Sequence, residues 1–181
     1  LTIIGNHGFY NMRIVIENRD TPIVLDLQSI SMQAPIGYST ISAGSATLIL
    51  YTSGEVKIYG NQSQTESLTD APSGLAAIIC STLSIQSADN LLIKGGDGHY
   101  GINGLYFHID GQNGGNGGSA INVYQGCIIN CDNVILLAGF AGNGGNAYGN
   151  GYKGYGGRGA YPIETSRIDG MNIYVLIKSD A

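Results

Sequence analysis

AIICSTLSIQSADNLLIKGG at residues 77–96 and AINVYQGCIINCDNVILLAG at residues 120–139 are two copies of one pattern. Each copy holds three short apolar segments, the third of which follows an Asp-Asn pair and ends at glycine. Ile78 and Ile121 are equivalent positions, and Ile163 follows at nearly the same interval. Short β-branched segments between turn residues are typical of strands, and repetition at a fixed period is typical of solenoids.

The repeat predicts an all-β fold, a right-handed parallel β-helix of about five coils. Ile78, Ile121 and Ile163 should stack inside it, because one coil cannot bury its inward residues alone. Asn90 and Asn133 should form an amide ladder, because they fall at the same turn of adjacent coils. Upstream, residues 23–27, 47–51 and 56–59 are further expected strands. A β-sandwich is the alternative, but two long loops at equivalent points of the repeat favour the solenoid.

Those two loops are glycine-rich. GGDGHYGINGLYFHIDGQNGGNGG spans residues 95–118 and GFAGNGGNAYGNGYKGYGGRG spans residues 139–159. Each contains ten glycines, which excludes an ordinary helix or strand. We expect them to leave one corner of adjacent coils and to lie side by side as extended, hydrogen-bonded backbones. One interpretation is a purely structural cover for the solenoid, and the other is a surface that binds a ligand.

Composition indicates one domain, residues 1–181, with 43% apolar and 12% charged residues. The net charge of −5 and the scattered Lys and Arg give no basic surface for nucleic acid. No apolar run is long enough for membrane insertion. Cys80, Cys127 and Cys131 are interpreted as small buried hydrophobic residues. The opening LTIIGNHGFY suggests a domain excised from a longer secreted or surface protein, so we expect an extracellular or cell-surface location.

The glycine-rich loops carry aromatic, amide and basic side chains. Aromatic faces next to amides suit sugars, whose C–H faces stack while the hydroxyl groups form hydrogen bonds. Packing of the loops themselves is the alternative role for the tyrosines. The candidate ligand-binding residues are Tyr100, Tyr106, His108, Asn113, Asn143, Tyr148, Tyr152, Tyr155 and Arg158.

The sequence contains no catalytic motif, and we expect no catalytic residue and no organic cofactor. Asp89 and Asp132 should lie on adjacent coils, where two carboxylates could act in a polysaccharide lyase or hydrolase, but an Asp-Asn pair is more typical of a turn. Asp97 and Asp110 are the candidate carboxylate ligands for a calcium ion.

The repeat, with Ala77 and Ile78, residues 83–85 and 91–96, and the copies at 120–121 and 133–139, resembles secreted or surface-anchored bacterial β-helix proteins. Some of these are carbohydrate-binding modules that bind acidic plant polysaccharide with calcium. This chain differs from them in having few clustered Asp residues. The second glycine-rich loop also resembles the adhesin tips of phage tail fibres, which display receptor-reading loops on glycine-rich backbones.

The sequence therefore predicts a non-catalytic carbohydrate-binding or adhesin module whose partner is a polysaccharide or a cell-surface glycan. Two alternatives stay open. One is a β-helix polysaccharide lyase or hydrolase, and the other is a receptor-binding tip or structural spacer of a fibre or surface protein. The oligomeric state is left open, although exposed end coils favour self-association.

Overall fold

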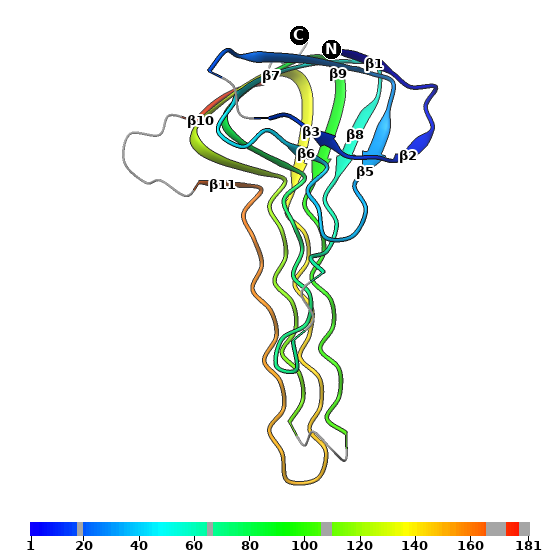
Figure 1. The fold of residues 1–181 in the computed structure, drawn as a ribbon, viewed down its shortest axis with the longest axis vertical. Helices are drawn as coiled ribbons and strands as arrows, with labels where there is room; N and C mark the ends of the chain where they lie inside the picture. The colour runs from blue at the N-terminus through cyan, green and yellow to red at the C-terminus, as the bar shows by residue number, and fades with distance from the viewer. Residues whose placement is uncertain (18–19, 65–66, 106–109, 166–172, 178–181) are drawn as a thin grey trace.

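Parallel β-strands form the head of the protein, and extended glycine-rich segments form a stalk below it (Figure 1). The computed structural model describes every residue except 18–19, 65–66, 106–109, 166–172 and 178–181. All regular elements among the described residues are strands. They are β1 (Thr2–Ile4), β2 (Phe9–Asn11), β3 (Ile14–Val15), β4 (Ile23–Gln28), β5 (Ser31–Gln33), β6 (Ile41–Ser42), β7 (Thr47–Ser53), β8 (Val56–Tyr59), β9 (Ile78–Lys94), β10 (Ile121–Leu137), β11 (Ile163–Thr165) and β12 (Ile173–Ile177).

All pairings between these strands are parallel, and the sheet curls around a buried interior, as a solenoid does. Strand β9 pairs with β6, β7 and β8 along one edge and with β10 along the other. In turn, β10 pairs with β11 and β12. Each strand thus lies beside the equivalent strand of the preceding repeat, which is the arrangement that the internal repeat predicts.

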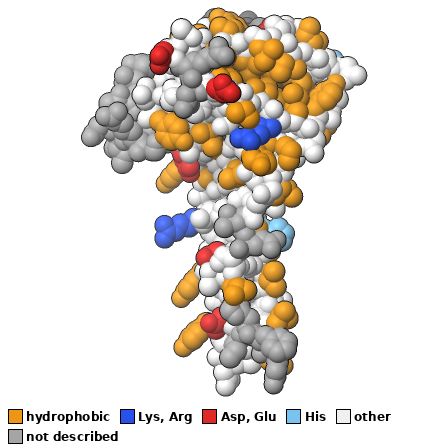
Figure 2. All heavy atoms as spheres, viewed as in Figure 1, with side chains coloured by type: hydrophobic (Ala, Val, Ile, Leu, Met, Phe, Trp, Pro, Cys, Tyr) orange, Lys and Arg blue, Asp and Glu red, His pale blue; other side chains and the backbone are white. Residues whose placement is uncertain are grey.

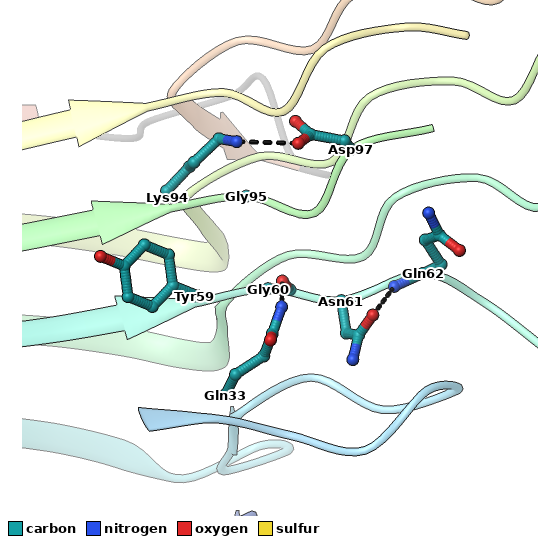
Figure 3. Close-up of a pocket in the computed structure, with 8 residues that line it drawn as sticks. All are labelled: Gln33, Tyr59, Gly60, Asn61, Gln62, Lys94, Gly95 and Asp97. Atoms are coloured by element: carbon teal, nitrogen blue, oxygen red, sulfur yellow. Dashed lines mark hydrogen bonds and ion pairs between the residues drawn. The ribbon is translucent and has the colours of Figure 1, made fainter. Parts of the chain in front are cut away.

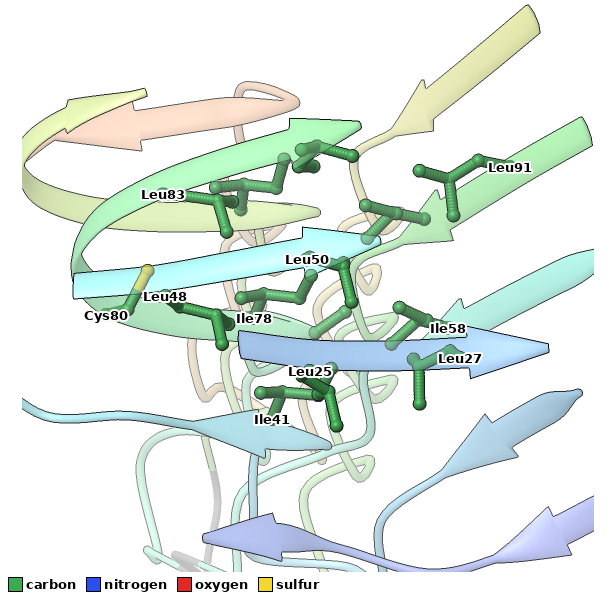
Figure 4. Packing of buried hydrophobic residues seen from close by; sticks show 14 of the residues in the cluster. Leu25, Leu27, Ile41, Leu48, Leu50, Ile58, Ile78, Cys80, Leu83 and Leu91 are labelled. Carbon is green, nitrogen blue, oxygen red and sulfur yellow. The ribbon is translucent and has the colours of Figure 1, made fainter. Parts of the chain in front are cut away.

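The predicted column of isoleucines is confirmed. Ile78 pairs with Ile121, and Ile121 pairs with Ile163. Ile78 and Ile121 are fully buried, and Ile163 packs against the same core. A second column runs through Leu25, Leu50, Ile85 and Ile129 in register. Figure 4 shows side chains from successive strands pointing into one interior.

The repeats differ from the prediction in one respect: β9 and β10 are single strands of 17 residues rather than three short ones. The polar residues that we expected to end the strands bend them instead. In β9, the hydroxyl of Thr52 donates to Ser87 Oγ, which donates to the carbonyl of Asp89, and Gly54 N–H donates to the Asp89 carboxylate. The register of β10 against β9 shifts between Cys131 and Asn133, so pairing resumes after the bend.

The Asn90 and Asn133 side chains form the predicted amide ladder, with Asn133 Nδ2 donating to Asn90 Oδ1. The three cysteines are buried, as predicted. Burial raises the pKa of the Cys80 and Cys127 thiols to about 12 and that of Cys131 to about 11. The described residues include no helix that is long and apolar enough to cross a membrane.

The stalk consists of residues 61–64, 67–75, 95–105, 110–118 and 139–161, which connect β8 to β9, β9 to β10 and β10 to β11. Its backbone hydrogen bonds recur every third residue. On the outgoing segments, Gly98, Gly101 and Gly104 donate to the carbonyls of Phe140, Asn143 and Asn146. On the returning segments, Gly111, Gly114 and Gly117 donate to the carbonyls of Tyr152, Tyr155 and Arg158. A period of three is that of the polyproline II conformation, so the stalk is a bundle of extended helices of this type.

Glycine is needed in the stalk because the backbones approach one another closely. A Cβ at Gly74 or at Gly139 would overlap the carbonyl oxygen of Gly96. A positive φ explains few of these residues: among the described stalk glycines, only Gly149 has one, at 59°. The missing side chains thus let the backbones hydrogen-bond directly.

Candidate functional site

The outer edge of the stalk is formed by its last segment, residues 151–161. Every third residue of this segment carries a large exposed side chain, and we call these residues the aromatic row: Tyr152, Tyr155, Arg158 and Tyr161. The tyrosines are 82%, 81% and 77% exposed. Gly154 and Gly157, between them, pack against the neighbouring segments. Figure 2 shows hydrophobic and basic side chains protruding one after another along this edge.

Both the N–H and the C=O groups of three residues in the row are hydrogen-bonded to the preceding returning segment, residues 110–118. The N–H groups of Tyr152, Tyr155 and Arg158 donate to the side-chain oxygens of Asp110, Asn113 and Asn116, at 2.8, 2.8 and 2.7 Å. The carbonyls of the same three residues accept from Gly111, Gly114 and Gly117, at 2.8, 2.8 and 2.9 Å. The backbone positions of the three side chains are therefore fixed before any ligand binds.

Asp and Asn side chains repeat this contact elsewhere in the stalk. Asp97 Oδ1 accepts from Phe140 N–H, and Asn103 Oδ1 accepts from Asn146 N–H, both at 2.7 Å. We call this set of contacts the Asx ladder. In the last segment, the positions equivalent to Asp110, Asn113 and Asn116 are occupied by Tyr152, Tyr155 and Arg158. Their side chains extend into solvent, so the ladder ends at a surface of aromatic and cationic groups.

A groove of about 930 Å³ is a second exposed feature, between residues 62–64 and 67–72 on one side and residues 99–105 and 110–112 on the other. Its apolar part is formed by Ile36, Leu68, Ile102 and Leu105, which are 54%, 77%, 63% and 62% exposed. The Gln112 amide that lines it is already used: Oε1 accepts from Ile102 N–H and Nε2 donates to the carbonyl of Asp70. The groove could hold the apolar part of a ligand, but its polar contacts mainly hold the two loops together.

A small pocket lies where the stalk meets the head (Figure 3). Lys94 Nζ forms an ion pair with Asp97 Oδ2 at 2.8 Å and lies 5.3 Å from the centre of the Phe140 ring. Gln33 Nε2 donates to the carbonyl of Gly60. The volume of about 140 Å³ is small for a ligand. These contacts join the ends of β5 and β9 to the residues where the stalk begins.

The structure brings three of the sequence-predicted residues together in the row: Tyr152, Tyr155 and Arg158. Tyr100, which is 66% exposed, and Asn143 lie on outgoing segments. Tyr148, 51% exposed, is in the turn at the tip of the second glycine-rich loop.

The remaining candidates are placed differently. The amide of Asn113 is occupied within the stalk, because Oδ1 accepts from Tyr155 N–H and Nδ2 donates to Asp70 Oδ1 at 2.9 Å. The pKa of Asp70 is lowered by this hydrogen bond and by one from Thr69. Tyr106 and His108 lie outside the described residues.

Three of the four candidate catalytic and metal-binding carboxylates each accept a hydrogen bond from a different backbone N–H group. Asp89 accepts from Gly54 N–H, and one oxygen of Asp97 and one of Asp110 accept backbone N–H groups of the next loop. Asp132 is exposed. Within the described part of the chain, His, Cys, Asp and Glu side chains form no group of three or more that could hold a metal ion.

Sequence reasoning identified the glycine-rich loops but not the row, and its candidates omitted Tyr161 and the apolar residues of the groove. The signal was present as glycine at every third position, at 98, 101 and 104 and at 111, 114 and 117. A period of three places every third side chain on one line. Comparison with known proteins gives no further guide, since no family model, curated protein or solved structure matches the chain.

Proposed function

We propose that this protein is a non-catalytic, extracellular glycan-binding module, an adhesin, whose binding site is the aromatic row. Tyrosine rings stack on the C–H faces of sugars, and the guanidinium of Arg158 donates hydrogen bonds to hydroxyl or carboxylate oxygens. The partner is a polysaccharide or a cell-surface glycan. Binding uses no catalytic residue and no cofactor.

The proposal includes a finer interpretation of the fold. We take the head to be a right-handed parallel β-helix of about five coils, from one corner of which the two long glycine-rich loops leave. Support comes from the parallel register of β9 with β10 and of β10 with β11 and β12. In this interpretation the β-helix is the rigid platform and the stalk presents the ligand site.

One observation carries the proposal. Three large, exposed side chains, at 152, 155 and 158, belong to residues whose own backbone N–H and C=O groups are all hydrogen-bonded to the preceding returning segment. Exposing aromatic rings to water costs free energy unless a partner covers them. A rigid row of this kind loses little entropy when it binds, which favours recognition of a ligand over packing.

Binding to a panel of immobilised glycans tests the proposal, using the full chain. We expect the double variant Tyr152→Ala, Tyr155→Ala to lose at least tenfold in affinity for the glycan that the unmodified protein retains. Tyr51→Ala is the matched control, because Tyr51 is a 40% exposed tyrosine on β7 of the head. Equal binding by the double variant and the control would exclude the row as the site.

A receptor-binding tip of a fibre is the second candidate function. It is favoured by the way the stalk projects from the head and ends in the turn at residues 148–151 (Figure 1). In a cell-binding assay, Tyr148→Ala would then reduce adhesion more than Tyr152→Ala does. The enzymatic alternative is tested by release of reducing ends from a polysaccharide panel, with Asp132→Asn as the inactive control.

A further inference from the structure

The row is periodic, and this restricts the shape of its ligand. Successive rungs, Tyr152, Tyr155, Arg158 and Tyr161, are three residues apart. A polyproline II helix rises about 3.1 Å per residue, so the rungs are separated by about 9 Å along the stalk axis. This separation is about the length of a disaccharide in an extended chain. One small sugar could reach only one rung.

The strip beside the row has no side chain at positions 156 and 159. A Cβ at Gly159 would meet nothing within 4 Å, and a Cβ at Gly156 would meet only the carbonyl oxygen of Gly142, at 3.8 Å. Within the described part of the chain, a Cβ would therefore meet open space at Gly159 and one ordinary van der Waals contact at Gly156. Their N–H groups make no hydrogen bond there, whereas those of the equivalent Gly114 and Gly117 do. Free donors thus line a strip that runs next to the row of rings.

This arrangement is complementary to one kind of ligand. An extended polymer of sugars offers C–H faces at intervals and oxygen acceptors between them along its length. A further stalk segment is not expected to pack on the last one. Asp110, Asn113 and Asn116 accept N–H groups from the next segment, whereas the equivalent positions of the last segment hold Tyr152, Tyr155 and Arg158.

We infer that the ligand is a linear, unbranched glycan that lies along the stalk axis and contacts several rungs at once. The inference rests on the proposed function, and it names the class of glycan. Once one rung has bound the glycan, contact with the next rung is an intramolecular step. The affinity therefore increases with the length of the glycan until the row is covered.

Oligosaccharide series test the inference. The probes are cello-oligosaccharides, chitin oligosaccharides and oligogalacturonides, from disaccharide to octasaccharide, titrated by calorimetry into the full chain. In the series that binds, we expect the affinity to increase roughly tenfold for each additional rung, and to reach a plateau when all rungs are covered.

A rearranged variant separates spacing from composition. Tyr155→Gly combined with Gly156→Tyr keeps the same residues but moves one ring off the line, into space that is open at position 156. We expect this variant to lose affinity for the octasaccharide by tenfold or more, and to lose clearly less for the disaccharide, which contacts one rung. Far-ultraviolet circular dichroism and the unfolding midpoint verify that it folds.

The outcomes distinguish the two proposals. Equal affinity for short and long oligosaccharides, or an octasaccharide affinity unchanged by the rearrangement, overturns the linear ligand and leaves glycan binding intact. Binding to branched glycans alone does the same. If the unmodified protein binds none of the glycans on the panel or in the series, the proposed function fails as well. A concentration-dependent dimer that Tyr155→Ala abolishes would assign the row to a second copy of this chain and would overturn both.

Discussion

Glycine has two different roles in this chain, and the contrast is clearest between Gly114 and Gly156. These residues occupy equivalent positions in successive returning segments. A Cβ at Gly114 would overlap the carbonyl oxygen of Gly142, whereas a Cβ at Gly156 would meet the same atom at only 3.8 Å. Neither has a positive φ. Gly114 is required because two backbones pack closely there, whereas Gly156 leaves a part of the surface without a side chain.

The two glycines therefore predict opposite responses to one methyl group. Gly114→Ala should lower the free energy of unfolding by about 1–3 kcal/mol, because the added carbon forces backbones apart. Gly156→Ala should leave it within about 0.5 kcal/mol or raise it slightly, since alanine restricts the unfolded chain. Urea denaturation of both variants gives the comparison. Similar losses in the two variants would contradict close backbone packing.

The buried thiols predict a pH dependence. The pKa of Cys80 and of Cys127 is raised from 9.0 to about 12 by desolvation, so the folded protein keeps protons that the unfolded chain loses. This contribution to stability is fully present below pH 9 and is lost as the pH increases from 9 towards 12. Denaturant midpoints measured from pH 8 to pH 11 should decrease, and less so in Cys80→Ala.

Reactivity follows from the same burial. Iodoacetamide at pH 8 should leave all three cysteines unmodified in the folded protein and alkylate all three in urea, because the thiolate is the reactive form. Mass spectrometry counts the adducts. As the pH is increased, Cys131 should react first, since its pKa is raised only to about 11. Rapid alkylation of Cys80 in the folded state would contradict the buried position on β9.

At the scale of elements, the Asx ladder attaches each stalk segment to the next. Asn116→Ala removes the acceptor for Arg158 N–H, and we expect a loss of about 1 kcal/mol of unfolding free energy. Amide hydrogen exchange should increase at Arg158 by about tenfold. Asn143→Ala is the control, because its exposed side chain makes no hydrogen bond within the described residues. Unchanged exchange at Arg158 would show that the ladder does not hold the last segment.

The head could be predicted from the sequence because apolar side chains carry its pattern. Ile78 and Ile121 mark equivalent inward positions, and the segments around them, rich in valine, isoleucine and leucine, indicate strands. The strands β1, β2 and β5 were missed, since segments of three residues with one inward side chain each, Ile3, Tyr10 and Met32, give a weak pattern. The continuity of β9 was missed because Ser87 and Asp89 hydrogen-bond across to the neighbouring strand, which turn chemistry alone does not predict.

The candidate site was predictable in kind but not in arrangement. Tyr152, Tyr155 and Arg158 were identified from their chemistry, but their alignment depends on the backbone period. That period follows from hydrogen bonds between segments about 42 residues apart, such as Asn113 to Tyr155. Composition gives no direct sign of such contacts. Asn113 also shows the reverse case, since an amide suited to sugars is used to hold the stalk.

At the scale of the whole molecule, the head and the stalk are stabilised differently. The head has a continuous apolar core from Ile14 to Ile129, whereas the stalk relies on backbone hydrogen bonds and places little apolar surface inside. Hydrogen exchange should therefore be slowest in β9 and β10 and faster in the stalk, where local opening does not expose a core.

The projecting stalk predicts the overall dimensions in solution. A compact domain of 181 residues has a radius of gyration of about 16 Å. We expect small-angle X-ray scattering to give a clearly larger value and an asymmetric distance distribution, because the stalk extends away from the head (Figure 1). A value near that of the compact domain would mean that the glycine-rich segments fold back on the head.

The three-residue period also limits how the stalk can change in length during evolution. Inserting one residue ahead of Lys153 rotates every later side chain of the returning segment by a third of a turn, which would carry Lys153 into the place of the packed Gly154. Only insertions of three residues, made in the neighbouring segments as well, keep each hydrogen-bond donor opposite its acceptor. The stalk can therefore lengthen only in steps of three residues, which is one turn of the polyproline II helix. Each step can add one more rung to the row.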